Sequence, residues 1–370
     1  LLKQDAIYDN LVLTGLRGIG KTVLLDELKP IAMRNGWLWA GADLSESVSV
    51  DEDKIAKRII ADLAVITSSI EIGQEVVNRI GFARDTILVP RSLNYDTLMN
   101  LYDELPGLVS DKLKQILEIV WDVIKKEGKR GIIFAYDEAQ KMSDQAKKEE
   151  YPLSVLLDVF QSIQKKGVRF MLVLAGLPTL FPKLVEARTY SERMFRVIFV
   201  DRLDKAASKD AILIPIDNHP IQLNDDSVDT IIGLSRGYPY FIQFICREVY
   251  DGFLQEVTAG KKPSVPTNEI IHKLDTDFFA GRWEPATDRQ KELLLVAAKL
   301  ENCGDEFSVY EITEKSKEIL NKPFSQSHAG QMLASLCASG LVYKNRYGKY
   351  SFAVPLLWEF ILRQKIEKKK

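Results

Sequence analysis

The chain has 370 residues, a length that predicts two or three domains, and its formal net charge is −2. Hydrophobic residues make up 46% and charged residues 28%, as in ordinary soluble globular proteins, and no apolar run approaches the roughly 20 residues of a membrane-spanning helix. The charge balance argues against blanket nucleic-acid affinity, though not against a local basic patch. No secretory signal is visible, but the chain does not begin with Met, which leaves a missing upstream piece open.

Cysteine and histidine are sparse and form no metal-binding pattern. Cys246 and Cys337 have apolar neighbours, whereas Cys303 lies between Asn302 and Gly304. We therefore expect reduced thiols, at least two of them buried, in a cytoplasmic protein without a zinc site or a membrane partner.

From residue 1 to about residue 204, short apolar strands alternate with helical patterns. We predict strands at Asn10–Thr14, Gly36–Ala42, Gly131–Tyr136, Arg169–Ala175 and Arg196–Val200. Apolar spacing near 3.6 residues predicts helices at Asp51–Ser69 and Leu113–Lys126. The alternation indicates an α/β fold with a parallel sheet covered on both faces. Ile70–Lys112 is long for one crossover, and we interpret it as an inserted helical excursion.

The first strand runs into a glycine-rich loop. Its sequence is Gly15-Leu16-Arg17-Gly18-Ile19-Gly20-Lys21-Thr22, which matches G-x-x-x-x-G-K-[ST] at every fixed position, and a helical pattern begins at Val23. The strand and the helix on either side are the context of a phosphate loop, because glycines let backbone N–H groups face a phosphate and the helix start adds more donors. Lys21 would reach the β- and γ-phosphates and Thr22 would ligate Mg²⁺. The alternative is a glycine-rich turn without a ligand.

The strand Gly131–Tyr136 is capped by two carboxylates, Asp137 and Glu138. Beside a phosphate loop, Asp137 would hold Mg²⁺ through water, and Glu138 would act as the general base that polarises the attacking water. One carboxylate does not easily do both jobs, because the metal lowers its basicity. The alternative is a pair of solvated carboxylates at a strand end.

Two further positions bear on ATP chemistry. The strand that ends at Ala175 offers no polar side chain to sense the γ-phosphate until Thr179, so Thr179 or backbone groups serve, or the sensor is absent. Arg193, and less so Arg196, precedes the last strand and could complete a neighbouring subunit's site as an arginine finger in a nucleotide-dependent homo-oligomer. The alternative is a surface arginine in an ion pair.

Residues 205–275 have a helical pattern, with helices predicted at Asp225–Leu234 and Tyr238–Phe253. Between them, Gly237 suits a helix C-cap and Pro239 suits the first turn of the next helix. This turn is either a simple helix–helix corner or part of a lid that presses on the nucleotide.

After the linker Gly260–Pro266, residues 276–370 predict a winged helix. The expected elements are helices at Thr287–Leu300, Ser308–Leu320 and Ser325–Ser339, then a hairpin of Leu341–Lys344 and Lys349–Phe352 around the turn Asn345–Gly348. Polar side chains at the start of the third helix could reach base edges of duplex DNA, namely Ser325, Gln326, Ser327, His328 and Gln331. Basic residues that could reach phosphates are Lys344, Arg346, Lys349, Arg363, Lys365, Lys368, Lys369 and Lys370. The second helix is acidic and winged helices also contact proteins, so both partners stay open.

Taken together, the motifs resemble AAA+ ATPases of the origin-recognition initiator and STAND-related branch. The residues that carry the resemblance are Gly15–Thr22, Asp137-Glu138-Ala139-Gln140, Ala175-Gly176-Leu177-Pro178, Gly237-Tyr238-Pro239 and the C-terminal winged helix. The resemblance implies a P-loop ATPase core at 1–204, a helical lid at 205–275 and a winged-helix domain at 276–370. Initiators carry an asparagine where this chain has Ala175-Gly176 and a lid arginine where it has Tyr240, and the Pro239 turn is more similar to STAND-type switches.

The expected function is an ATP-dependent molecular switch with slow hydrolysis that uses ATP or ADP and Mg²⁺. Its nucleotide state would position the winged helix for DNA binding. One alternative is a signalling or defence ATPase whose winged helix makes protein contacts only. A third hypothesis is a transposition-type ATPase that forms filaments on DNA.

Overall fold

The structure is a computed structural model that describes residues 9–41, 43–44, 51–78, 86–217, 219, 222–258, 263–344 and 348–364, without the side chains of 71–91 and 146. Several predicted features lie outside the described residues: Ala42, the linker residues Gly260–Lys262, the hairpin turn at 345–347 and the basic tail from Lys365. The chain forms two compact units. One comprises Leu1–Thr14 with Lys21–Phe199, and the other comprises Gly15–Gly20 with Val200–Lys370.

A parallel sheet forms the centre of the first unit. Its strands are β1 (Asn10–Thr14), β2 (Trp37–Ala40), β5 (Gly131–Tyr136), β6 (Phe170–Gly176) and β7 (Phe195–Phe199), in the order β2-β5-β6-β1-β7. The five predicted strands are confirmed to within two residues in the described part. Thr14 pairs with Gly176 on one side and Phe199 on the other, so the carboxyl ends of these strands meet at one edge of the sheet. In open α/β sheets, ligands bind outside that edge.

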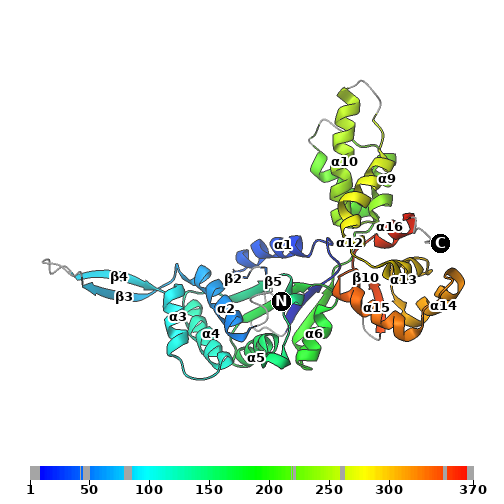
Figure 1. Cartoon of the computed structure of the whole chain (residues 1–370). Coiled ribbons are helices and arrows are strands. Elements are labelled where there is room, and N and C mark those ends of the chain that lie inside the picture. The colour runs from blue at the N-terminus through cyan, green and yellow to red at the C-terminus, as the bar shows by residue number, and fades with distance from the viewer. Residues whose placement is uncertain are drawn as a thin grey trace. The chain divides into compact units, whose positions relative to one another are not determined.

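Helices cover the sheet (Figure 1). They are α1 (Lys21–Arg34), α2 (Glu52–Thr67), α3 (Tyr95–Glu104), α4 (Val109–Lys126), α5 (Pro152–Lys165), α6 (Leu180–Ala187) and α7 (Ser191–Met194), with short 3-10 turns η1 (Ala139–Lys141) and η2 (Ala146–Lys148). Strands β5 and β6 are buried along their whole length, as expected for a sheet covered on both faces. The aromatic centre of this core is Phe134, whose ring centroid lies 5.2 Å from that of Phe160 and 5.7 Å from that of Phe170.

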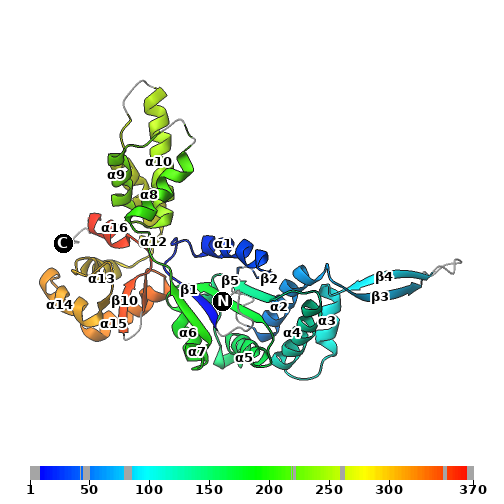
Figure 2. The ribbon, with the colours of Figure 1, turned by 180° about the vertical axis from the view of Figure 1, so that it is seen from behind.

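The segment Ile70–Lys112 corrects one prediction. Its first half is an antiparallel hairpin of β3 (Glu71–Asn78) and β4 (Thr86–Ser92), and only the second half is helical. Both views show the hairpin projecting from the α3 side of the first unit (Figures 1 and 2). The helical interpretation was wrong because it gave too little weight to the β-branched residues here, such as Val76, Val77 and Ile87, which favour extended backbone.

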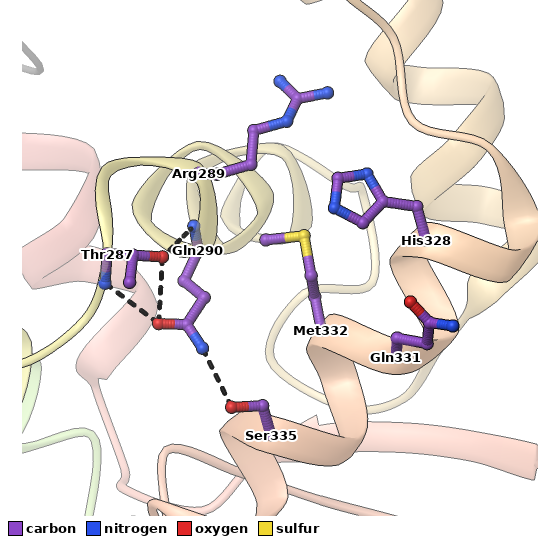
Figure 3. Close-up of a pocket in the computed structure, with 7 residues that line it drawn as sticks. All are labelled: Thr287, Arg289, Gln290, His328, Gln331, Met332 and Ser335. Atoms are coloured by element: carbon purple, nitrogen blue, oxygen red, sulfur yellow. Dashed lines mark hydrogen bonds between the residues drawn. The ribbon is translucent and has the colours of Figure 1, made fainter.

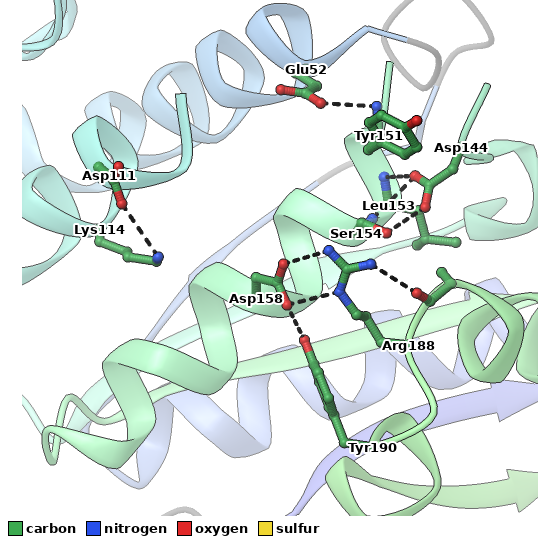
Figure 4. A network of polar contacts seen from close by, with 11 residues as sticks. Glu52, Asp111, Lys114, Asp144, Tyr151, Leu153, Ser154, Asp158, Arg188 and Tyr190 are labelled. Carbon is green, nitrogen blue, oxygen red and sulfur yellow. Dashed lines mark hydrogen bonds and ion pairs between the residues drawn. The ribbon is translucent and has the colours of Figure 1, made fainter. Parts of the chain in front are cut away.

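Polar contacts fasten α5 within the first unit (Figure 4). Asp144 accepts hydrogen bonds from the backbone N–H groups of Leu153 and Ser154 at 3.0 and 3.1 Å, which satisfies donors at the helix start. Asp158 forms two bonds with the Arg188 guanidinium, at 3.0 and 2.7 Å, and accepts another from the Tyr190 hydroxyl. Partial burial acts to raise the pKa of Asp158, but these hydrogen bonds outweigh burial and hold the pKa below its ordinary value.

The second unit is mostly helical. Its elements are α8 (Lys205–Leu213), η3 (Ile214–Ile216), α9 (Asp225–Ser235), α10 (Pro239–Thr258), α11 (Thr267–Lys273), η4 (Leu274–Ala280), α12 (Gly281–Trp283), α13 (Asp288–Ala298), β8 (Phe307–Ser308), α14 (Val309–Ile319), α15 (Gln326–Ala338), β9 (Val342–Lys344), β10 (Lys349–Phe352) and α16 (Leu357–Arg363). The three helices and the hairpin expected between residues 287 and 352 are present, and β8 adds a third strand in the order β8-β10-β9. Ser308 and Ser325 cap α14 and α15 with their side chains.

One hydrophobic core runs through the second unit, from α8, α9 and α10 to α16. Its centre is a chain of four aromatic rings. The ring centroid of Phe278 lies 5.1 Å from that of Phe241 and 4.9 Å from that of Phe279. The Phe279 ring in turn stacks on Phe360, with 5.2 Å between the ring centroids. Phe278 and Phe279 belong to η4, a π-helical turn that continues directly into α12. The proposed lid and winged helix therefore share one core, and the division into three domains stays a prediction.

The cysteines reverse the expected pattern of burial. All three are free thiols, but Cys303 is buried whereas Cys246 and Cys337 are only partly buried. The polarity of the sequence neighbours did not predict the burial of Cys303, because this residue packs into the core of the second unit through tertiary contacts. Within the described residues, no helix is both long and apolar enough to cross a membrane.

Candidate functional site

Thr22 and Asp137, 115 residues apart in the chain, meet at the carboxyl edge of the sheet. The Thr22 hydroxyl donates to Asp137 Oδ2 at 2.5 Å, and the backbone N–H of Glu138 donates to Asp137 Oδ1 at 2.7 Å. Asp137 is only 6% exposed. Thr22 is the second residue of α1 and Asp137 follows β5, so the strand–loop–helix order brings a hydroxyl and a carboxylate together. This pair is the oxygen donor set that the sequence predicts for Mg²⁺.

Glu138 directly follows Asp137 and adopts an unusual backbone conformation. Its φ is +54°, in the left-handed region that non-glycine residues seldom occupy. Its side chain is 36% exposed, and Oε2 lies 3.9 Å from the Lys141 ammonium. Such conformations often mark functional sites.

A polar contact that the sequence did not reveal holds the Glu138 carboxylate. Gln140 Nε2 donates to Glu138 Oε2 at 2.7 Å, while Gln140 Oε1 accepts from the Leu177 backbone N–H at 3.1 Å. The Lys183 ammonium donates to the Gln140 carbonyl at 2.7 Å, and burial lowers the pKa of Lys183 from its ordinary value. Gln140 thus links the end of β5 to the segment after β6.

The predicted alternative sensor, Thr179, precedes α6 and makes no side-chain capping bond. It is partly buried. Sensing of the γ-phosphate by the Thr179 hydroxyl stays a prediction.

The loop Gly15–Gly20 contacts the start of α10 within the second unit. Gly18 and Gly20 have φ values of +73° and +93°, as the proposed phosphate loop requires of its glycines. The Tyr240 backbone N–H donates to the Gly18 carbonyl at 3.1 Å, and a Cβ at Gly18 would lie 2.8 Å from Tyr240 Cβ. Among the described residues, no atom lies within 4 Å of a Cβ built at Gly20, so its left-handed backbone rather than lack of space favours glycine there.

The turn before α10 largely matches its prediction. Pro239 is the first residue of α10, and Gly237 has a φ of +78°. The C-cap position of α9 is Arg236, however, and this residue is itself left-handed with φ +52°. Arg236 Nε also donates to Glu359 of α16 at 3.1 Å, which ties the turn to the last helix of the unit.

The three arginines before the last strand differ in their contacts. Arg188 is held in the ion pair with Asp158. Arg193 on α7 and Arg196 on β7 are exposed, and neither side chain forms an ion pair with any residue that the structure describes. Arg193 is therefore accessible to a neighbouring molecule, which is the condition that the arginine-finger proposal requires.

The exposed face of α15 borders an open pocket of about 300 Å³ with the start of α13 (Figure 3). His328 and Gln331 line this pocket from α15, and Gln326 and Ser327 are exposed nearby on the same helix. Gln290 of α13 crosses to α15 by donating to the Ser335 hydroxyl at 3.1 Å.

Several basic side chains around the predicted wing already have partners. Lys349 pairs with Glu311 at 3.2 Å, and Arg363 forms two bonds with Asp275, at 3.0 and 2.5 Å. Lys344 is exposed at the end of β9. The basic surface predicted from the sequence is thus smaller in the described part of the chain than the number of basic residues indicates.

No group of three or more His, Cys, Asp or Glu side chains in the described part of the chain could hold a metal ion.

Comparison with known proteins gives a partial family match. A family model described as "Domain of unknown function (DUF8462)" matches residues 276–361. A search of curated proteins found no match.

Solved structures give a likeness over nearly the whole chain. The Walker-type ATPase PABY2304 of Pyrococcus abyssi is 12% identical, with a TM-score of 0.57, 95% of this chain covered and 90% of that one. The ORC2 protein of Aeropyrum pernix in its ADPNP–ADP complexes is 13% identical, with a TM-score of 0.53 and coverages of 98% and 89%. Its ADP form is 14% identical, with a TM-score of 0.51 and coverages of 98% and 88%.

At these identities the likeness shows the fold alone. The predicted α/β core with a parallel sheet is confirmed, and the fold is similar to those of the Walker-type ATPase and the ORC2 protein. The residue roles predicted from the sequence are not tested by this likeness.

Proposed function

We propose that the chain is an AAA+ molecular switch that binds and slowly hydrolyses ATP. The observation that carries the proposal is the contact between the Thr22 hydroxyl and Asp137 Oδ2 at 2.5 Å, with Glu138 as the next residue. A strand–glycine loop–helix motif supplies the first residue and the end of a buried strand supplies the other two. The solved structures of ORC2 with ADPNP and ADP support nucleotide as the ligand class.

The residues present fit a nucleoside triphosphate and a divalent cation. The loop from Gly15 to Val23 would hold the phosphates with its backbone N–H groups, and Lys21 would add an ammonium. Thr22 and Asp137 would hold Mg²⁺, which supplies charge neutralisation to the phosphate oxygens when bound. Pro239 fixes the start of α10 next to Tyr240, so the proposed lid meets the loop at Gly18.

The proposed reaction is an in-line displacement by water. Glu138 orients the water and accepts its proton while the water oxygen forms a bond to the γ-phosphorus. The bond between the γ-phosphorus and its bridging oxygen breaks, and ADP leaves with the bonding electrons. Asp137 is already engaged by Thr22 and by the Glu138 N–H, so a separate carboxylate takes the proton.

The test of ATP binding is calorimetric titration of the full chain with ATP, ADP and GTP in the presence of Mg²⁺. We expect binding of the adenine nucleotides, followed by slow release of phosphate from ATP. If well-folded protein shows no heat with either adenine or guanine nucleotides, the proposal fails.

In a homo-oligomer, Arg193 would act in trans. Its exposed position on α7 is compatible with an arginine finger that reaches the γ-phosphate in a neighbouring subunit. The proposal requires a nucleotide-dependent increase in size, which light scattering with a non-hydrolysable ATP analogue would detect.

The second candidate is DNA binding by a C-terminal winged helix, with α15 as the element that meets the bases. The observation that favours it is the exposed face of α15, where Gln326, Ser327, His328 and Gln331 are polar and none is acidic. Such side chains bond base edges readily, whereas acidic ones would repel the phosphates.

Titration of duplex DNA at about 50 and 200 mM salt tests this candidate. Two phosphate contacts predict a loss of affinity of about tenfold between these concentrations. Gln331→Ala should weaken binding, and Gln115→Ala on α4 in the other unit serves as the control. Absence of binding with and without ATP would favour a STAND-like signalling or defence ATPase whose C-terminal elements contact proteins only.

A further inference from the structure

Gln140 is 9% exposed, and its side chain lies between two strand ends. Its amide donates to Glu138 Oε2 at 2.7 Å and accepts from the Leu177 N–H at 3.1 Å. The chemistry of the partners fixes which end of the amide is which, because a carboxylate only accepts and an N–H only donates. The side chain therefore bridges the residue proposed as general base to the chain just after β6.

The Gln140 side chain occupies space that is available because residue 176 is a glycine. A Cβ at Gly176 would lie 2.5 Å from Gln140 Oε1 and 2.9 Å from Leu180 Cδ2. The last position of β6 thus has no side chain because the Gln140 amide fills its place. A polar group does lie at the end of this strand, but it comes from the loop after the neighbouring strand.

The two oxygens of Glu138 differ as a result. Oε2 receives the Gln140 amide and faces the Lys141 ammonium at 3.9 Å. Oε1 has no hydrogen-bond or ion-pair partner among the residues that the structure describes. Because the hydrogen bond to Oε2 fixes the orientation of the carboxylate, Oε1 points in a fixed direction, in which it can accept a hydrogen bond from a water molecule.

We propose that Gln140 is the positioning residue of the hydrolysis site. It fixes the Glu138 carboxylate through Oε2, so that Oε1 accepts the proton of the attacking water. It also joins Glu138 to the end of β6, which lacks a polar side chain of its own at Ala175 and Gly176. This inference rests on the proposed ATPase function and specifies how that site is arranged.

The test compares two substitutions that separate the bonds of the amide. Gln140→Met keeps the volume and removes both hydrogen bonds, whereas Gln140→Glu can still accept from the Leu177 N–H but no longer donates to Glu138. We expect both to lower kcat by about 10- to 100-fold, because misplacement of a catalytic group by about 1 Å has an effect of this size. The KM for ATP should change by less than about threefold if the residue acts on the chemical step.

A double substitution separates positioning from simple packing. In a Glu138→Gln background, Gln140→Met should change kcat by less than about twofold, because the group that it positions is gone. Gln115→Met is the matched control, since Gln115 is exposed on α4 and, among the described residues, its side chain bonds only to the Asp111 carbonyl.

The outcomes distinguish this inference from the function on which it rests. Wild-type protein that hydrolyses no ATP would overturn the proposed function. If the wild type hydrolyses ATP, Glu138→Gln does not and a folded Gln140 variant keeps full kcat, only the role of Gln140 is overturned. Equal losses from Gln140→Met with and without Glu138 would also overturn it. Should Gln140→Met fail to fold, Gln140→Glu still provides the kcat and KM measurements, alone and in the Glu138→Gln background.

Discussion

Glu138→Gln is expected to retain ATP binding and to lose turnover by about 10²-fold or more, the usual contribution of a general base. An amide has nearly the shape of the carboxylate but does not accept the proton of the attacking water. Binding should persist because Thr22 and Asp137 make their contact without the Glu138 side chain. Steady-state phosphate release and a calorimetric ATP titration on the same preparation measure the two effects.

The chain offers a close control for this substitution. Glu149 is also a left-handed, non-glycine residue, with φ +56°, and its side chain is exposed. Glu149→Gln changes the same residue type in the same backbone conformation but at a position that does not adjoin Asp137 in sequence, so its turnover should equal that of the wild type. Wild-type turnover in Glu138→Gln would show that another group takes the proton.

The parts of the fold that the sequence predicts well are those with local signals. Buried strands such as β5 and β6 are apolar throughout, and a glycine loop that ends in Lys-Thr between a strand and a helix is typical of phosphate binding. Helix starts at Ser308, Ser325 and Pro239 follow from capping preferences that act within one turn. These rules need no knowledge of the rest of the chain.

The parts that the sequence did not reveal depend on distant contacts. Gln140 could be recognised only by its bond to Leu177, 37 residues later, and by the space left at Gly176. In the sequence, Gln140 stands only as the last residue of the motif Asp137-Glu138-Ala139-Gln140, which does not show what its side chain contacts. Cys303 was misjudged for the same reason, since its burial comes from helices that are remote in sequence.

A continuous set of contacts in the second unit could transmit a nucleotide-dependent movement from the loop at Gly18 to α16 in the proposed switch. Tyr240 contacts Gly18 through its backbone, and its ring lies 5.0 Å from Phe278 of the π-helical turn. Phe279 of the same turn stacks on Phe360 of α16. A π-helical turn is an irregular element that often accompanies function. Because the rings are packed in one core, we expect a shift of α10 to reach α16 without an intervening flexible linker.

Lys21→Ala is expected to abolish measurable nucleotide binding. Lys21 is the first residue of α1 and is only 8% exposed as a residue, and charge interactions are stronger in such partly desolvated surroundings than in bulk water. A hydrogen bond to a charged group contributes about 1.5–3 kcal/mol, so contacts with two phosphates correspond to about 10²-fold or more in affinity. Calorimetric titration with ATP and Mg²⁺ measures the loss directly.

Two further variants keep this result interpretable. Lys29→Ala removes an exposed ammonium from the same helix and should bind ATP as the wild type does. Lys21→Met keeps the apolar stem in its buried position, so it separates loss of the charge from loss of packing. If Lys21→Met melts at the wild-type temperature and still binds ATP with unchanged affinity, the ammonium has no part in binding and the phosphate-loop assignment is wrong. If binding disappears while the fold persists, the loop that begins at Gly15 is the nucleotide site on which the proposed switch depends.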